Sequence, residues 1–178
     1  IRDSAATARS RFRVKPDGMV RNVVFMGMGE PLDNYDAVHE ALRGLTHQYL
    51  FQLGAKHLTV STVGASARTL RWLADEAPQV NLAVSLHAAL QASRALLIPS
   101  AKSTPLPALG AALDYHARQC GRGAMLEYLL IADVNDRDVD VAALADFCHA
   151  RNVVATVFVN LIPYNPTLAG MEFGYTTP

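Results

Sequence analysis

The sequence predicts an α/β fold built on a parallel sheet, and three observations lead to this expectation. Five short apolar segments alternate with helical patterns at intervals of about 25 to 45 residues, as in strand–helix repeats with right-handed crossovers. The first segment, 23–27, is a continuous apolar run, which is typical of a strand covered on both faces. Each segment also ends in polar residues. The alternation alone is compatible with a closed barrel, a partial barrel or an open doubly wound sheet.

Turn residues and helical periodicity define the elements of the first half. Residues 1–15 read as helical or irregular, and Pro16-Asp17-Gly18 reads as a turn. The first strand is expected at about 22–28, and Pro31, which disfavours helix at Glu30, ends it. Asp33 or Asn34 caps the next helix. The later elements expected in this half are a strand at 57–62 that stops at Gly64, a helix at 66–76 and a strand at 80–87; the inward face of the first helix is Val38, Ala41, Leu42, Leu45 and Tyr49.

The second half continues the same alternation. A polar stretch with Ser93 and Arg94 leads through Pro99 to Pro105 and Pro107. The elements expected after it are a helix at 106–119, a strand at 124–131, a loop at 133–138, a helix to about 150 and a strand at 153–162 that ends at Pro163.

Composition narrows the class of protein. The chain has 178 residues, about half of them apolar, which suits one globular domain and excludes general disorder. Lys and Arg balance Asp and Glu at 16 each, so net charge gives no support for nucleic-acid binding but leaves room for a local basic patch. No apolar run approaches a membrane span. Cys120 and Cys148 have no metal-ligand spacing and predict buried thiols in a reducing, cytoplasmic setting.

Polar residues at the strand ends are the main functional signal. The carboxyl ends of parallel strands meet at one edge of the sheet, where α/β proteins bind ligands. Hydroxyls, amides, a carboxylate and an imidazole gathered there are suited to holding a polar small molecule. No Gly-rich phosphate loop is present. The polar strand ends are Gly29-Glu30, Ser61-Thr62, Ser85 with His87, Asp133 with Asn135, and Asn160 with Asn165.

Each of these residues also has an ordinary structural explanation. Glu30 suits a solvated strand-to-helix turn, Ser61 a bond to a neighbouring backbone group, and His87 a hydrogen-bonded rim position. Glu127 lies within an apolar strand, where a carboxylate needs a partner. That partner is either a group on the inner side of the sheet or an Arg of a covering helix. The remaining histidines and both cysteines are expected to be structural or at the surface.

Four motifs in this order resemble a known family. They are Val23-Val24-Phe25-Met26-Gly27-Met28-Gly29-Glu30-Pro31-Leu32, Leu58-Thr59-Val60-Ser61-Thr62-Val63-Gly64, Leu82-Ala83-Val84-Ser85-Leu86-His87-Ala88 and Asn160-Leu161-Ile162-Pro163-Tyr164-Asn165-Pro166. Together they resemble the radical S-adenosylmethionine RNA methyltransferases that methylate C2 of an adenosine in 23S rRNA and tRNA. A relative that methylates C8 is the close alternative. The resemblance covers about residues 20–167 and implies a partial, TIM-like (β/α) barrel at 22–167, after a lead-in at 1–21 and before a carboxyl-terminal segment at 168–178.

The resemblance also implies roles for individual residues. Gly29 and Glu30 would hold the amino end of S-adenosylmethionine, since a carboxylate beside an ammonium forms a charge-assisted hydrogen bond. Ser61, Ser85 and His87 would contact its ribose and carboxylate, with Leu86 contributing backbone. Asn160 would contact the adenine end of S-adenosylmethionine. The implied partners are 23S rRNA, tRNA and an electron donor, with no membrane.

The sequence departs from the family in its cysteines. The family holds a [4Fe–4S] cluster on Cys-x-x-x-Cys-x-x-Cys and uses two further cysteines in catalysis, and none of these motifs occurs here. The expectation is a barrel truncated at both ends, with the cluster loop upstream of Ile1 and the methyl-carrying cysteine downstream of Pro178, and therefore a fragment inactive alone. The alternatives are a non-catalytic RNA-binding scaffold derived from the same barrel, and a barrel enzyme acting on a small polar substrate.

Overall fold

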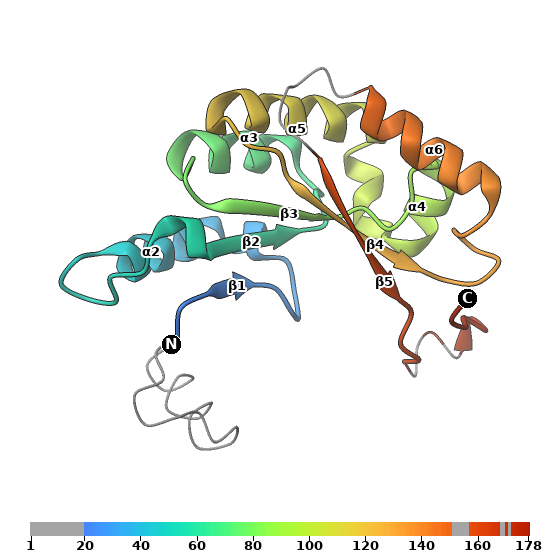
Figure 1. Cartoon of the computed structure of the whole chain (residues 1–178), viewed down its shortest axis with the longest axis horizontal. Helices are drawn as coiled ribbons and strands as arrows, with labels where there is room; N and C mark the ends of the chain where they lie inside the picture. The colour runs from blue at the N-terminus through green and yellow to red at the C-terminus, as the bar shows by residue number, and fades with distance from the viewer. Residues whose placement is uncertain (1–19, 151–156, 168–169, 171) are drawn as a thin grey trace.

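A computed structural model describes residues 20–150, 157–167, 170 and 172–178. Its centre is a five-stranded sheet, all parallel, with the strands in the order β1-β2-β3-β4-β5 (Figure 1). The strands are β1 (Val23–Phe25), β2 (Leu58–Thr62), β3 (Asn81–Ser85), β4 (Met125–Leu130) and β5 (Phe158–Pro163). The helices are α2 (Tyr35–Thr46), α3 (Ala67–Glu76), α4 (Gln91–Leu97), α5 (Leu106–Cys120) and α6 (Asp138–His149), with short 3₁₀ turns η1 (Pro31–Asn34), η2 (Ala55–His57) and η3 (Pro99–Ser103).

One face of the sheet carries the core. Strand residues alternate between faces, so Leu58 and Val60 share a face with Leu82, Val84 and the neighbouring apolar positions of β4. These side chains are almost completely buried, and they form one cluster with leucines from the helices. The helices therefore cover this face, as the layer of α3, α5 and α6 above the sheet in Figure 1 illustrates.

The opposite face holds the polar strand positions. Ser61, Ser85, Glu127 and Asn160 all point to this side, because the register pairs Ser61 with Ala83, Ser85 with Glu127 and Glu127 with Asn160. The described residues place no helix on this face. Side chains at the edge of this face are consequently exposed to solvent, and the exposed fraction of Phe158 on the edge strand β5 is 63%.

The sequential strand order distinguishes between the architectures that the alternation left open. A doubly wound sheet reverses its strand order at a switch point and carries helices on both faces. Here the order never reverses and the helices pack on one face, which is the arrangement of an arc of a (β/α) barrel. The expected α/β fold with a parallel, partial barrel is confirmed.

Local predictions were wrong for two elements. The first strand covers Val23–Phe25 rather than 22–28, and it is not buried on both faces, since half of Val24 is exposed. Gly27 and Gly29 have positive φ angles of 148° and 86°, so the backbone leaves the sheet after Phe25. The helix expected to reach Tyr49 ends at Thr46, and Tyr49 is exposed.

The stretch around Arg94, for which no element was predicted, forms helix α4. Leu90, Arg94, Leu97 and Ile98 recur at helical spacing and face inward, so an arginine occupies a position on the apolar side. The final strand begins at Phe158 in the described structure; residues 151–156, where its start was expected, lie outside the described ranges, as do 1–19.

The carboxyl-terminal residues return to the rim of the sheet. The carbonyl of Thr176 accepts a hydrogen bond from the amide of Ala132 at 3.0 Å, and the Thr177 hydroxyl donates to the Tyr164 carbonyl at 2.8 Å. Within the described ranges, no helix combines the length and apolar character needed to cross a bilayer.

Candidate functional site

The carboxyl ends of the strands form a small hollow, which we call the rim pocket. Its volume is about 90 Å³, enough for a small charged or polar group but not for a whole nucleoside. Gly29, Glu30, Ser61 and Ser85 are four of the predicted site residues, and all four line it. The complete lining is Met26, Gly27, Gly29, Glu30, Pro31, Ser61, Thr62, Val63 and Ser85. Residues from three separate segments thus meet at one place.

Glu30 is held by backbone donors on both of its carboxylate oxygens. Oε1 accepts from the amide of Leu32 at 3.1 Å and so caps the 3₁₀ turn η1. Oε2 accepts from the amide of Val63 at 2.8 Å, which joins the β1 loop to the end of β2. A carboxylate offers about four acceptor positions, so two remain for a cationic group in the pocket. The solvated turn considered from the sequence does not describe this residue.

Ser61 and Ser85 present hydroxyls on the open face beside Glu30. Ser61 is 6% exposed and Ser85 is half-buried. Neither hydroxyl has a hydrogen-bond partner in the part of the chain that the structure describes, so Ser61 does not make the backbone bond that was its alternative explanation. Two such hydroxyls are suited to a ligand with several oxygen atoms.

Glu127 and Asn160 form a pair in the same row as Ser85. The Asn160 Nδ2 donates to Glu127 Oε2 at 2.7 Å, and Glu127 is 4% exposed. The partner of this buried carboxylate is therefore an inner-face amide, not an arginine from a helix. Because the amide nitrogen faces the carboxylate, the Asn160 Oδ1 is the atom left to accept a bond from a ligand. Two strand spacings, roughly 10 Å, separate Ser85 from Asn160.

His87 follows β3 in an unusual backbone conformation, with a φ of 55°. Its Nδ1 accepts a hydrogen bond from the amide of Leu129 at 3.1 Å, so the neutral ring carries its proton on Nε2. Burial, followed by the nearby charge of Arg94, lowers the pKa of His87 to about 4. The ring is neutral at physiological pH and presents an N–H donor.

Asn135 fixes the position of His87. The side-chain amide of Asn135 donates to the carbonyls of His87 and Leu129, both at 2.6 Å, while its Oδ1 accepts from the amide of Ile131 at 2.8 Å. Asn135 is 1% exposed, and the hydroxyl of Tyr128 donates to its carbonyl at 2.8 Å. The loop asparagine is thus a structural residue that holds the ends of β3 and β4 together. Asp133, in the same loop, is exposed.

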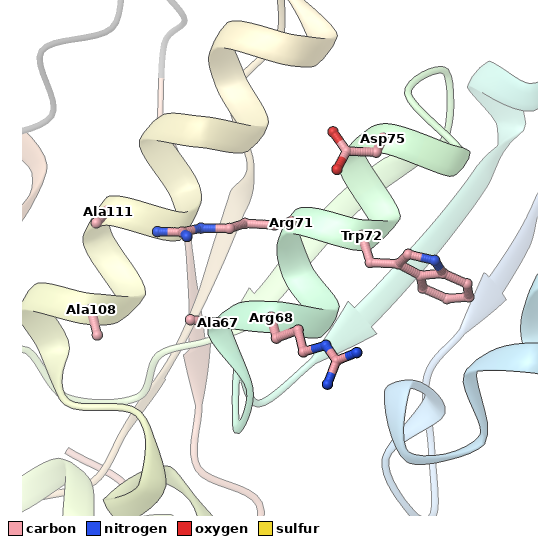
Figure 2. Close-up of a pocket in the computed structure, with 7 residues that line it drawn as sticks. All are labelled: Ala67, Arg68, Arg71, Trp72, Asp75, Ala108 and Ala111. Carbon is pink, nitrogen blue, oxygen red and sulfur yellow. The ribbon is translucent and has the colours of Figure 1, made fainter.

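A larger hollow of about 410 Å³ lies on the helical side, between α3 and α5 (Figure 2). Arg71 points across it toward α5, where its guanidinium lies 5.7 Å from the ring centre of Tyr115. The Tyr115 hydroxyl donates to Asp75 at 2.7 Å. Arg71 and Asp75, two of its polar lining residues, are therefore engaged with Tyr115, and the hollow contains none of the strand-end residues. The smaller rim pocket is the better candidate site.

The residues present do not fit an iron–sulfur cluster. Cys120 and Cys148 lie at the ends of α5 and α6, and burial raises the pKa of the Cys120 thiol. Three thiolates are needed to bind a [4Fe–4S] cluster that keeps one iron open. Across the described ranges, no group of three His, Cys, Asp or Glu side chains is placed to hold a metal ion. The rim pocket, by contrast, offers a carboxylate and two hydroxyls to a small polar group.

Comparison with known proteins supports the resemblance seen in the motifs. No protein-family model matches the chain. Three curated relatives are each named probable dual-specificity RNA methyltransferase RlmN. That of Salinibacter ruber is 45% identical over 160 residues, that of Corynebacterium glutamicum 42% over 169, and that of Thermotoga maritima 40% over 153. These alignments cover 89%, 94% and 86% of this chain but only 42%, 44% and 43% of the relatives. The chain therefore spans less than half the length of the relatives that it matches.

Solved structures give the same picture for the fold. A radical SAM methyltransferase from Sphaerobacter thermophilus superposes with a TM-score of 0.86 at 36% identity, covering 99% of this chain and 48% of that one. A domain of a pyruvate-formate lyase-activating enzyme from Bacteroides vulgatus superposes at 0.64 and 18% identity, covering 89% and 86%, which is a likeness of fold alone. The predicted resemblance to radical S-adenosylmethionine methyltransferases is confirmed.

Two features of the site were missed from the sequence. The Glu127–Asn160 pair requires knowledge of the strand register, which no local pattern contains. The burial of Arg94 could have been recognised, because its spacing from Leu90, Leu97 and Ile98 is helical. The predicted sites Leu86 and His87 do lie at the rim, where the amides of both donate to the Glu127 carbonyl.

Proposed function

We propose that this chain is the central and carboxyl-side part of the barrel of a radical S-adenosylmethionine RNA methyltransferase. The complete enzyme would methylate C2 of an adenosine in 23S rRNA and tRNA, in the cytoplasm and with an external electron donor. The observation that carries the proposal is the meeting of Gly29, Glu30, Ser61 and Ser85 in one pocket, in a chain similar to RlmN-type proteins.

Glu30 is assigned to the ammonium of S-adenosylmethionine. Its two backbone hydrogen bonds fix the carboxylate in place before ligand arrives, which reduces the ordering cost of binding. The ammonium would use the remaining acceptor positions in a charge-assisted bond. Gly29, with a φ of 86° and no atom within 4 Å of an added Cβ, leaves the backbone open to the ligand.

The other residues are assigned along the ligand from β2 toward β5. The Ser61 and Ser85 hydroxyls and the Nε2–H of neutral His87 would contact the ribose and carboxylate, with backbone from Leu86. Asn160, whose nitrogen is occupied by Glu127, would offer Oδ1 to the amino group of adenine. The separation of roughly 10 Å between Ser85 and Asn160 allows one extended ligand to reach both.

The remaining parts of the enzyme are assigned outside this chain. A [4Fe–4S] cluster, when bound, supplies one electron for the cleavage of S-adenosylmethionine; its ligands are not among these residues, so we expect the fragment to be inactive alone. The target base must leave its stack to reach the rim, and this costs a few kcal/mol per base. The open face of the sheet allows access for such a base.

The test uses the full-length protein. After anaerobic reconstitution with iron and sulfide, it is expected to form 5′-deoxyadenosine from S-adenosylmethionine and 2-methyladenosine in a 23S rRNA fragment or tRNA, both measured by mass spectrometry. Glu30→Gln is expected to weaken S-adenosylhomocysteine binding tenfold or more, while Glu40→Gln, at an exposed position of α2, leaves it unchanged. RNA binding without any 5′-deoxyadenosine would support the scaffold instead, and 8-methyladenosine would assign the C8 reaction.

A further inference from the structure

Arg94 is the largest completely buried side chain of the described structure, with an exposed fraction of 0%. Its Nη2 donates to the carbonyl of Val63 at 2.6 Å, while its Nε and Nη1 have no hydrogen-bond partner. Among the described residues no carboxylate forms an ion pair with it. A buried charge without a counter-ion is unfavourable, so packing alone does not explain this side chain.

Arg94 is linked to the rim pocket through Val63. Val63 follows β2 and lines the pocket, and its amide donates to Glu30 Oε2 at 2.8 Å. The carbonyl of the same residue is the acceptor for Arg94. Both backbone polar groups of Val63 are thus engaged, the carbonyl by Arg94 and the amide by Glu30, so one residue connects the guanidinium to the carboxylate.

The charge of Arg94 also acts on His87, which follows β3 and is not among the residues that line the rim pocket. After burial, this charge is the second cause of the low pKa of His87. Burial lowers the pKa of Arg94 itself to about 10, which still leaves it charged at neutral pH. Among the described residues no carboxylate is in direct contact with Arg94, and its positive field favours an anionic group of a ligand near His87.

We infer that Arg94 is a positioning residue of the rim pocket, which holds Val63 and Glu30 in place and makes the pocket specific for the amino-acid end of S-adenosylmethionine. This inference rests on the proposed function and adds a residue to it. Arg94 touches neither the ligand nor the reacting atoms; it acts through Val63 and through its charge.

The experiment compares two ligands that share the nucleoside. S-adenosylhomocysteine has the amino-acid end, and 5′-methylthioadenosine lacks it. Calorimetry on the full-length protein is expected to show that Arg94→Met weakens S-adenosylhomocysteine binding tenfold or more and changes 5′-methylthioadenosine binding less than twofold. Arg94→Lys, which keeps the charge but loses the planar fork, is expected to fall between the wild type and Arg94→Met. Arg68→Met, at an exposed position of α3, is the matched control with unchanged affinities.

A double-mutant cycle tests the connection to Glu30. The product of the two separate losses of affinity gives the value expected for independent sites. The double variant Arg94→Met/Glu30→Gln is expected to bind S-adenosylhomocysteine at least threefold more tightly than that value, because both changes act at Val63. Independent effects would overturn the inference, as would equal loss of both ligands or no loss of either. If Arg94→Met does not fold, Arg94→Lys takes its place in the comparison of the two ligands. It is expected to weaken S-adenosylhomocysteine binding at least threefold and to change 5′-methylthioadenosine binding less than twofold. A wild-type protein that binds neither ligand would instead contradict the proposed function.

Discussion

The Asn160 side chain donates its amide to the carboxylate of Glu127 across β4 and β5, at 2.7 Å. This contact joins a residue assigned to the adenine end of the ligand to a carboxylate that is almost completely buried. Asn160 therefore has a structural role in the protein without ligand, and its substitution has two consequences that can be separated.

We expect Asn160→Leu to destabilise the protein by about 2–4 kcal/mol, because it leaves a buried carboxylate without its partner. In a Glu127→Gln background the same substitution is expected to cost at least about 1 kcal/mol less, since a neutral amide is easier to leave unpaired. Urea unfolding measures all four proteins. Asn165→Leu, at an exposed position of the same motif, is the control and should change stability by less than about 0.5 kcal/mol. Additive costs would show that the pair is not coupled.

The pH dependence of stability is expected to report His87 and His116. Burial is the main cause that lowers the pKa of each to about 4, with Arg94 and Arg122 as the respective second causes. The unfolded chain binds these protons near pH 6.5, so the stabilisation is complete above that pH and is lost as the pH falls toward 4. Each shift corresponds to roughly 3 kcal/mol.

Denaturant unfolding between pH 4 and 7.5 measures this dependence. His116→Gln and His87→Gln should each make the slope of stability against pH shallower between pH 4 and 6.5. His47→Gln, at an exposed position, should leave it unchanged. A wild-type stability that stays constant over this range would contradict the assignment.

Gly64 is expected to tolerate no side chain. Its φ is 68°, and a Cβ built on it would lie 2.7 Å from Leu109 Cδ1 in the core. Gly64→Ala should therefore cost about 2–4 kcal/mol, the sum of left-handed strain and overpacking. Gly44→Ala is the matched control: Gly44 lies in α2 with no atom within 4 Å of an added Cβ, so this change should stabilise the protein by about 0.5–1 kcal/mol. Equal effects in thermal unfolding would argue against the close contact with Leu109.

Asn135 is expected to contribute more to stability than Tyr128, whose hydroxyl is hydrogen-bonded to the Asn135 carbonyl. Asn135→Ala leaves two carbonyls and one amide without their partner, and we expect a loss of about 3–5 kcal/mol. Tyr128→Phe removes one hydrogen bond and should cost about 1–2 kcal/mol. In NMR spectra, the ring signals of His87 should shift in the first variant and stay close to their wild-type positions in the second. The reverse ranking would show that Asn135 does not hold the strand ends together.

The sequence predicted the repeating architecture because apolar runs and helical periods are local properties. Four of the five strands were placed within a few residues, and the rim residues were found because parallel strands end at one edge. Helix α4 was missed since the polar Ser93 and Arg94 obscured its period. The burial of the first strand was overestimated because an apolar run does not reveal whether the second face has a cover.

By itself, the sequence determined the order of strands and helices, the family likeness and the residues that meet at the rim. Only the tertiary structure decided which contacts those residues make: Glu30 with Val63, Asn160 with Glu127, and Arg94 with the carbonyl behind the pocket. The physical reason is that hydrogen bonds between residues more than thirty positions apart depend on strand register and helix packing, and neither is recorded in any local stretch of the chain.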